Sequence, residues 1–158
     1  MRETTRAASV NPADRTELSA LVHRYAAAVD DRDIEAVVEL LTPDAELVLP
    51  TPPDVLTPVQ AYRGADGIRA ALDAVTAVGR TPHNIDSEVY RGAAEDDVAH
   101  GRIGGTAHHW TRHHDTITDL VWYLRYDDDY RRTASGWLIG RRTLTIDAIE
   151  TRPARRMR

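Results

Sequence analysis

The chain has 158 residues, of which 42% are hydrophobic and 28% are charged, and its formal net charge is −5. This length is typical of one domain, and the composition excludes a wholly disordered or fibrous protein. The negative charge argues against nucleic-acid binding, which needs a basic face to neutralise phosphates. Because the chain has no cysteine, disulfides and sulfur-ligated zinc are excluded, and any metal site would need His, Asp or Glu ligands.

The sequence predicts neither a membrane-spanning segment nor a secretory signal. No apolar segment approaches the roughly 18 to 20 residues needed to span a bilayer, and the first residues lack the hydrophobic core of a secretory signal. We therefore expect a cytoplasmic protein with no membrane partner. Residues 1–13 are expected to form a flexible leader, residues 14–150 a single domain, and residues 151–158 a basic tail.

Three helices are predicted in the first half of the chain, where apolar residues recur at intervals of three and four. Asp14 and Glu17 have the spacing of a capping box at the start of the first helix. The predicted helices cover about residues 14–30, 34–41 and 65–78. A strand is expected at residues 45–50, and the proline-rich residues that follow it are expected to be irregular.

From Pro82 onwards the hydrophobic pattern has a period of two, which predicts strands separated by turns. The predicted strands cover about residues 83–91, 97–111, 116–130 and 136–149. Helices followed by an antiparallel meander predict an α+β fold with the helices on one face of the sheet.

Candidate catalytic residues are few, since the sequence has neither a glycine-rich phosphate loop nor the GxSxG motif of serine hydrolases. Asp30 ends the first predicted helix, where an acid opposes the helix dipole. An exposed loop acid is the alternative interpretation, and Asp31 or Asp33 would be equally good candidates. Tyr25 lies on the apolar face of the same helix, and His83 opens the first long strand.

Four histidines crowd into residues 108–115, which read HHWTRHHD. Successive side chains of a strand point to opposite faces, so His108 and His109 cannot bind one ion together without a bulge. His113 and His114 fall at the hairpin turn, roughly 15 Å further along the strand. The cluster therefore does not predict a metal site. The alternation places His108 on one face together with Trp110, and His109 on the other.

Four segments resemble the SnoaL-like branch of the nuclear-transport-factor-like superfamily, over residues 14–150. These segments are YAAAVDDRDIEAVVELLTPDAEL, YRGADGIRAAL, TPHNID and YDDDYRRTASGWLIGRRTL. The resemblance implies a cone-shaped α+β barrel, in which three N-terminal helices pack in a curved, mainly antiparallel sheet around one pocket.

The resemblance also implies site residues, by similarity to scytalone dehydratase, bile acid 7α-dehydratase and a related dehydrochlorinase. The implied catalytic residues are Tyr25, Asp30, His83, His108 and Arg142, with Arg141 as the alternative to Arg142. The residues expected to bind the substrate are Trp110, Trp122, Leu124, Tyr126 and Leu144. His108 and Trp110 would then face the pocket, and His109 would lie on the outer surface.

The implied function is the cofactor-independent dehydration, by β-elimination, of a hydroxylated cyclic or polyketide-like substrate. His83 would be the base and Asp30 would orient it, because an imidazole titrates near neutral pH and a carboxylate can fix its tautomer. Tyr25 and Arg142 would stabilise the enolate, and His108 would protonate the leaving hydroxyl. Polyketide cyclisation, ketosteroid-type isomerisation, non-catalytic ligand binding and a structural role in a larger enzyme are the alternatives. No metal and no organic cofactor is implied.

The expected partner is a small-molecule substrate, with no nucleic acid and no membrane. A homodimer or homotrimer is also expected, because the outer face of the sheet would need covering. The residues expected on that outer face are Ile103, Val121, Tyr123 and Ile139.

Overall fold

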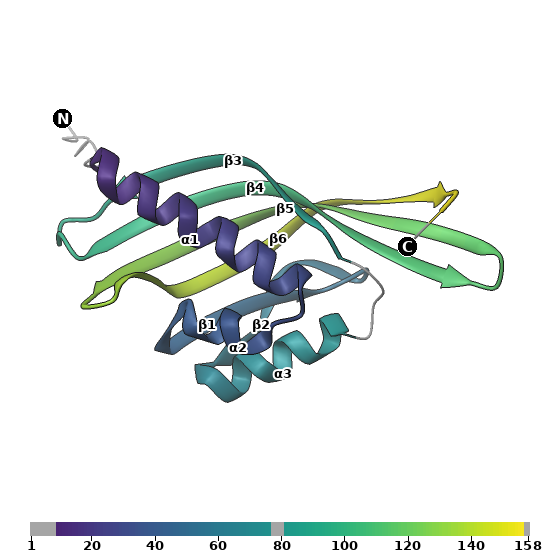
Figure 1. Cartoon of the computed structure of the whole chain (residues 1–158), viewed down its shortest axis with the longest axis horizontal. Coiled ribbons are helices and arrows are strands. Elements are labelled where there is room, and N and C mark those ends of the chain that lie inside the picture. Colours follow the sequence, from purple (N-terminus) through teal and green to yellow (C-terminus); the bar gives the residue numbers. More distant parts are fainter. Residues whose placement is uncertain (1–8, 77–80, 157–158) are drawn as a thin grey trace.

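The computed structural model describes residues 9–76 and 81–156. Three helices and six strands follow one another along the chain: α1 (Pro12–Asp30), α2 (Ile34–Glu39), β1 (Leu41–Thr51), β2 (Val55–Arg63), α3 (Gly64–Thr76), β3 (His83–Gly92), β4 (Val98–His113), β5 (Thr116–Thr133) and β6 (Gly136–Ala154). The strands form one curved, open sheet, and the helices lie on one face of it (Figure 1). The predicted α+β fold is thereby confirmed.

The sheet has the strand order β2-β1-β6-β5-β4-β3. All neighbouring strands are antiparallel except β1 and β6, which are parallel. The long strands β4, β5 and β6 form the curved part of the sheet against which α1 packs (Figure 1). The core therefore lies between α1 and the inner face of the sheet, and α2 and α3 extend it over β1.

The first helix begins at Pro12, two residues before the predicted start. Its N-cap is Asn11, whose side chain accepts a hydrogen bond from the backbone N–H of Asp14, and a proline is well suited to the first helical position. Asp14 is itself buried, and it accepts a hydrogen bond of 3.0 Å from the indole N–H of Trp137 on β6. This contact fixes the start of α1 against the sheet.

The prediction of an irregular segment after residue 50 is wrong, because the chain turns at residues 52–54 and returns as β2. This strand is at the edge of the sheet and pairs only with β1. Proline cannot donate a backbone hydrogen bond, but an edge strand has a side on which no donor is needed. Pro58 is therefore compatible with β2.

A β-bulge in β3 changes which side chains face the core. Simple alternation predicts that His83, Ile85, Ser87 and Val89 share one face, but the register with β4 shifts between Ile85 and Ser87. Beyond the bulge the outward residues are Ser87 and Val89, and Val89 is 51% exposed. His83 lies before the bulge, on the same face as its partner Ala107, which is fully buried.

The register of the β4–β5 hairpin determines which residues of β4 lie on the inner face of the sheet. His113 pairs with Thr116 across a two-residue turn, and the same register pairs Ile103 with Tyr126. Ile103 is fully buried, which contradicts the expectation that it lies on the outer face. Ile139 is also in the core, whereas Val121 pairs with His108 on the outer face as expected but is only 1% exposed. Of the expected outer residues only Tyr123 is exposed. The argument for self-association from these residues is therefore lost, and a homodimer or homotrimer stays a prediction.

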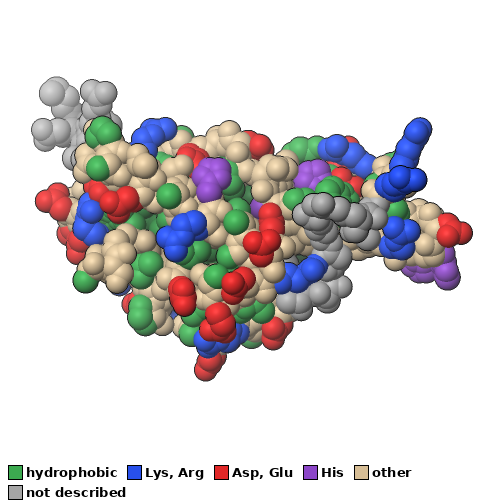
Figure 2. Space-filling view, in the orientation of Figure 1, with side chains coloured by type: hydrophobic (Ala, Val, Ile, Leu, Met, Phe, Trp, Pro, Cys, Tyr) green, Lys and Arg blue, Asp and Glu red, His purple; other side chains and the backbone are tan. Residues whose placement is uncertain are grey.

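Acidic and basic side chains are interspersed on the face of the molecule that Figure 2 shows, with apolar side chains scattered between them. In the described part of the chain, no helix is both long and apolar enough to cross a membrane.

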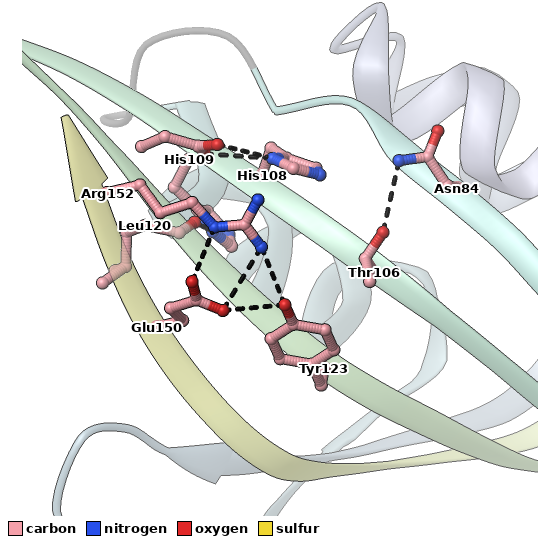
Figure 3. A network of polar contacts seen from close by, with 9 residues as sticks. Asn84, Thr106, His108, His109, Leu120, Tyr123, Glu150 and Arg152 are labelled. Atoms are coloured by element: carbon pink, nitrogen blue, oxygen red, sulfur yellow. Dashed lines mark hydrogen bonds and ion pairs between the residues drawn. The ribbon is translucent and has the colours of Figure 1, made fainter. Parts of the chain in front are cut away.

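The last strand is longer than predicted, because β6 continues to Ala154 and so includes part of the expected basic tail. Arg152 donates to the carboxylate of Glu150 at 2.8 Å and to the hydroxyl of Tyr123 at 2.7 Å (Figure 3). These bonds hold the end of β6 against β5. Most of the expected leader, residues 1–8, lies outside the described residues.

Candidate active site

A cavity of about 510 Å³ lies between α1, the inner face of the sheet and the end of β1. Its walls are mostly aromatic and aliphatic, and its polar side-chain groups are imidazoles, hydroxyls and the indole of Trp122. The lining residues include Tyr25, His83, His109, Thr111, Thr118, Leu120, Trp122 and Tyr126. Among the lining residues that the structure describes there is no Lys, Arg, Asp or Glu. Such a site suits a neutral ligand with an apolar body.

Asp30 and His83 meet at one wall of this cavity, although 53 residues separate them in the sequence. The Asp30 carboxylate accepts from the His83 ring Nδ1 at 2.6 Å through one oxygen. Its other oxygen accepts from the His83 backbone N–H at 2.9 Å. Two donors from one residue hold the carboxylate in a single orientation, and they offset its unfavourable place at the C-terminal end of α1.

The surroundings of His83 also fix its tautomer. The ring Nδ1 lies 2.6 Å from the Asp30 carboxylate and 3.1 Å from the carbonyl oxygen of Thr81, and both of these atoms are acceptors. Nδ1 must therefore carry the proton in the neutral ring, which leaves the lone pair on Nε2. Nε2 forms no hydrogen bond within the described residues, and His83 lines the cavity.

The other two acids of the DDRD segment have local roles. Asp31 is the C-cap residue of α1. Asp33 is the N-cap of α2, where its side chain accepts from the backbone N–H of Ala36 at 3.0 Å. Asp30 is thus the acid of this segment that contacts His83.

The expected orientation of the two neighbouring histidines of β4 is wrong. His109 lines the cavity, whereas His108 lies on the opposite face of the strand, where its Nδ1 is 2.8 Å from the Asp119 carboxylate. Two residues that pair directly across neighbouring strands point to the same face of the sheet. His109 pairs in this way with Leu120 of the cavity wall. Trp110 follows His108 onto the outer face, with its ring centre 6.0 Å from that of His108.

His109 is a buried and neutral imidazole. Its Nδ1 lies 3.1 Å from the carbonyl oxygen of Leu120, and its ring centre lies 4.2 Å from that of Trp122. Burial lowers the pKa of His109, because the charged ring would lose its hydration, and a positive charge on His83 would lower that pKa further. Donation to the carbonyl places the proton on Nδ1, so Nε2 carries a lone pair.

Arg142 is not part of the cavity wall, contrary to expectation. Only 1% of its surface is exposed, and its guanidinium forms a bidentate pair with Asp128 at 2.8 and 2.6 Å. Two tyrosine rings of the cavity wall stack on it, with ring centres 4.1 Å (Tyr25) and 4.2 Å (Tyr126) from the guanidinium carbon. Arg142 therefore reaches the cavity only through these rings. Arg141, the alternative, is exposed and points toward Glu46.

Tyr25 and Tyr126, whose rings stack on this buried cation, carry phenol groups on the cavity wall. Burial raises the pKa of Tyr25, and the charge of Arg142 opposes that rise. Burial likewise raises the pKa of Tyr126. Both tyrosines consequently stay protonated across the physiological range and can donate hydrogen bonds to a ligand in the cavity.

The expected substrate-binding residues divide into two groups. Trp122, Tyr126 and Leu144 line the cavity. Leu124 is instead buried in the core, and Trp110 is on the outer face with His108. In the part of the chain that the structure describes, no three His, Asp or Glu side chains converge to hold a metal ion.

Sequence reasoning missed His109, Thr111, Thr118 and the residues of β1 and β2 that face the cavity. A signal for His109 was present in β4 itself. His109 shares a face with Ile103 and Ala107, whereas His108 shares a face with Arg102 and Thr106. The apolar set is the one that packs into a core, so it marks the inner face.

Comparison with known proteins places the fold in a family. The model of the SnoaL-like domain matches residues 12–143. No curated protein matches this sequence. A solved structure from Novosphingobium aromaticivorans, provisionally assigned as an aromatic ring hydroxylase, is 25% identical, with a TM-score of 0.75 over 92% of this chain and 96% of that one.

Two further structures have the same fold at lower identity. A provisionally assigned scytalone dehydratase from Novosphingobium aromaticivorans is 17% identical, with a TM-score of 0.73 over 87% of each chain. A type 2 hexachlorocyclohexane dehydrochlorinase is 15% identical, with a TM-score of 0.73 over 90% of this chain and 89% of that one. The family match covers most of the chain and confirms the resemblance inferred from the sequence. The chain therefore belongs to the SnoaL-like domain family.

Proposed function

We propose that the protein is a lyase- or isomerase-type enzyme whose reaction begins when His83 removes a proton next to a carbonyl group. The observation that carries this proposal is the position of the His83 Nδ1 between the Asp30 carboxylate and the Thr81 carbonyl. This arrangement leaves a basic Nε2 on a residue of the cavity wall, and Asp30 would stabilise the imidazolium that forms.

Dehydration of a neutral β-hydroxy ketone is the reaction that these residues favour most. His83 Nε2 takes the proton from the α-carbon, and the electrons of that C–H bond move to the carbonyl oxygen. The hydroxyls of Tyr25 and Tyr126 donate hydrogen bonds to the resulting enolate oxygen. The enolate then expels the β-hydroxyl group, which takes the proton from His83 and leaves as water.

His109 has a different role from the acid that the sequence predicted at His108. Burial lowers its pKa, so it holds no spare proton to give to the leaving group. Its Nε2 lone pair can instead accept a hydrogen bond from the substrate hydroxyl and hold that group near His83. One imidazole therefore moves the proton, and the other orients the substrate.

Relatives with the same fold support a reaction of this kind. One is named a scytalone dehydratase and another a hexachlorocyclohexane dehydrochlorinase, and both names describe eliminations. Double-bond isomerisation and aldol-type cyclisation begin with the same proton transfer, so the same residues would serve them. The product decides among the three: loss of water, a shifted double bond, or a new ring.

The proposal is tested by turnover of a panel of cyclic β-hydroxy ketones and hydroxylated polyketide and steroid ketones. His83→Gln should lower kcat by about 10²- to 10⁴-fold, the usual contribution of a general base. His109→Gln should lower turnover, whereas the matched His108→Gln, on the opposite face of the same strand, should not. Full activity of His83→Gln, or binding without turnover by the unchanged protein, would overturn the proposal.

A structural role in an oxygenase assembly is a second candidate, favoured by one observation. The relative with 25% identity is provisionally assigned as an aromatic ring hydroxylase. A subunit that serves only assembly has no use for the Asp30–His83 contact. Co-purification with a catalytic subunit, with normal assembly of the Asp30→Asn variant, would support this candidate over the enzyme.

A further inference from the structure

We propose that the cavity contains a second binding subsite, formed by Thr111 and Thr118, for a neutral oxygen atom at the end of the substrate remote from His83. The subsite adds a substrate class to the proposed function. It depends on that function only for the end of the substrate that His83 contacts. It assigns to the substrate class a second oxygen function, separated from the reacting carbon by an apolar body.

The two threonines are cross-strand partners. Thr111 on β4 pairs with Thr118 on β5, and both side chains line the cavity. Directly paired side chains have Cβ atoms about 4.5 to 5.5 Å apart, so one ligand oxygen placed between them can contact both hydroxyls. The pair is therefore spaced to bind a single carbonyl or hydroxyl oxygen.

Neither of these hydroxyls forms a hydrogen bond within the described residues, although other threonines of the sheet do. Thr143 donates to the carbonyl of Asp127 at 3.2 Å, and Thr133 donates to that of Gly136 at 2.9 Å. Thr106, on the opposite face of β4, accepts from Asn84 at 3.2 Å. Thr111 is exposed and Thr118 is half-buried, so the pair lies at the open end of the cavity, where both hydroxyls are available to a ligand.

The distance to the reacting group sets the length of the ligand. His83 pairs with Ala107, and Thr111 lies four residues further along β4. At the rise of a strand this separation is about 13 Å. The wall between them is formed by His109, Trp122 and Leu120, which offer ring faces and a methyl-rich surface. A rigid, fused-ring body with an oxygen function at each end matches this arrangement.

The charge of the wall limits the distal group to a neutral one. The described lining residues include no Lys or Arg, and burial lowers the pKa of His109, so that this residue stays neutral. The described lining therefore offers no cation to pair with a carboxylate, sulfate or phosphate at the threonine pair. A ketone or an alcohol needs no such partner and can use the two hydroxyls alone.

A matched pair of rigid steroids tests the subsite. Androst-4-ene-3,17-dione carries an oxygen at both ends, and androst-4-en-3-one lacks the distal one. Affinities are measured by the quenching of tryptophan emission, since Trp122 lines the cavity. The unchanged protein should bind the dione about five- to tenfold more tightly, the effect of one neutral hydrogen bond. The double variant Thr111→Val/Thr118→Val should lose this preference.

Two control variants separate the subsite from general effects on the fold. Thr118→Ser keeps the hydroxyl and should keep the preference. Thr106→Val removes a hydroxyl from the opposite face of β4 and should also keep it. Equal affinities for the two steroids, an unchanged preference in the double variant, or binding of neither steroid overturns the subsite.

The outcome is independent of the proposed chemistry. His83→Gln should lower kcat by about 10²- to 10⁴-fold and leave the steroid preference intact, because His83 does not touch the threonine pair. A protein that prefers the dione but has no His83-dependent turnover would contradict the proposed function and not the subsite.

Discussion

The guanidinium carbon of Arg142 lies 4.1 Å from the centre of the Tyr25 ring, and the same cation stacks on Tyr126. Asp128 neutralises it through two hydrogen bonds and also accepts one of 2.6 Å from the hydroxyl of Tyr130. The position of the two cavity tyrosines thus depends on a charge pair that is buried behind the cavity wall.

Arg142→Met should destabilise the protein by about 3 to 5 kcal/mol, because Asp128 would be left buried without its cation. Urea denaturation of the variant measures the change. The double variant Arg142→Met/Asp128→Leu removes both charges, and it should be more stable than the single variant. A single variant within about 1 kcal/mol of the unchanged protein would contradict the interpretation.

Asp30→Asn should lower kcat by about 10²- to 10⁴-fold with little change in KM. The ring N–H and the backbone N–H of His83 each need an acceptor, and the Asp30 carboxylate has two oxygens to offer them. An amide has only one oxygen, so its NH₂ group would face one of these two donors. The matched control is Asp31→Asn, which alters the exposed C-cap of α1. Equal activity of the two variants would show that Asp30 does not position the base.

His109 should make the stability of the fold sensitive to acid. Burial lowers its pKa in the folded chain, so below about pH 6.5 the unfolded chain binds more protons at this residue than the folded chain does. The free energy of unfolding therefore falls as the pH drops through that range.

Chemical denaturation at pH 8, 7, 6 and 5 checks this expectation against His109→Gln. The carboxylates titrate alike in both proteins, so the stability difference between them isolates residue 109. That difference should change in favour of the variant as the pH falls. A difference that is constant from pH 8 to pH 5 would mean that His109 titrates normally in the fold.

Gly105→Ala should destabilise the protein by about 1 to 3 kcal/mol, because the added methyl group would overlap the carbonyl oxygen of Asn84 on β3. The backbone of the strand that carries His83 would have to move. Gly140→Ala on β6 is the control, since its nearest atoms would be 3.4 and 3.5 Å away, which is ordinary contact. Thermal denaturation of both variants gives the comparison, and equal losses of stability would refute the close approach.

Most of the fold could be predicted from the sequence because periodicity is a local signal. The stripe from Leu18 to Val29 and the alternation of β4, β5 and β6 each follow from the residues themselves. The bulge in β3 could not be predicted, since Asp86 is a polar residue in a polar segment and nothing near it marks an extra residue. Strand β2 was not predicted because prolines usually indicate irregular structure, although an edge strand tolerates them.

The site was predicted less completely, since it depends on which face of each strand is inward. With Tyr126 inward, a two-residue turn at His114 and Asp115 makes His109, and not His108, its companion on the inner face. The inward position of His109 could therefore be predicted from the sequence, but only by way of the hairpin register. Alternation also places Asp128 on the face of Tyr126 and Tyr130, opposite Arg142. What could not be foreseen is that the rings of Tyr25 and Tyr126 cover the guanidinium and separate it from the cavity.

The sheet order places His83 on β3, an edge strand that only β4 holds on one side. Local opening of an edge strand costs less free energy than unfolding of the whole sheet. Such an opening would carry His83 away from Asp30 while β4, β5 and β6 stay paired. Heating should therefore inactivate the protein at a lower temperature than the one at which the far-ultraviolet circular dichroism of the sheet is lost. The same opening would offer the free edge of β4 to the strands of other molecules, so the temperature that ends activity should also begin aggregation.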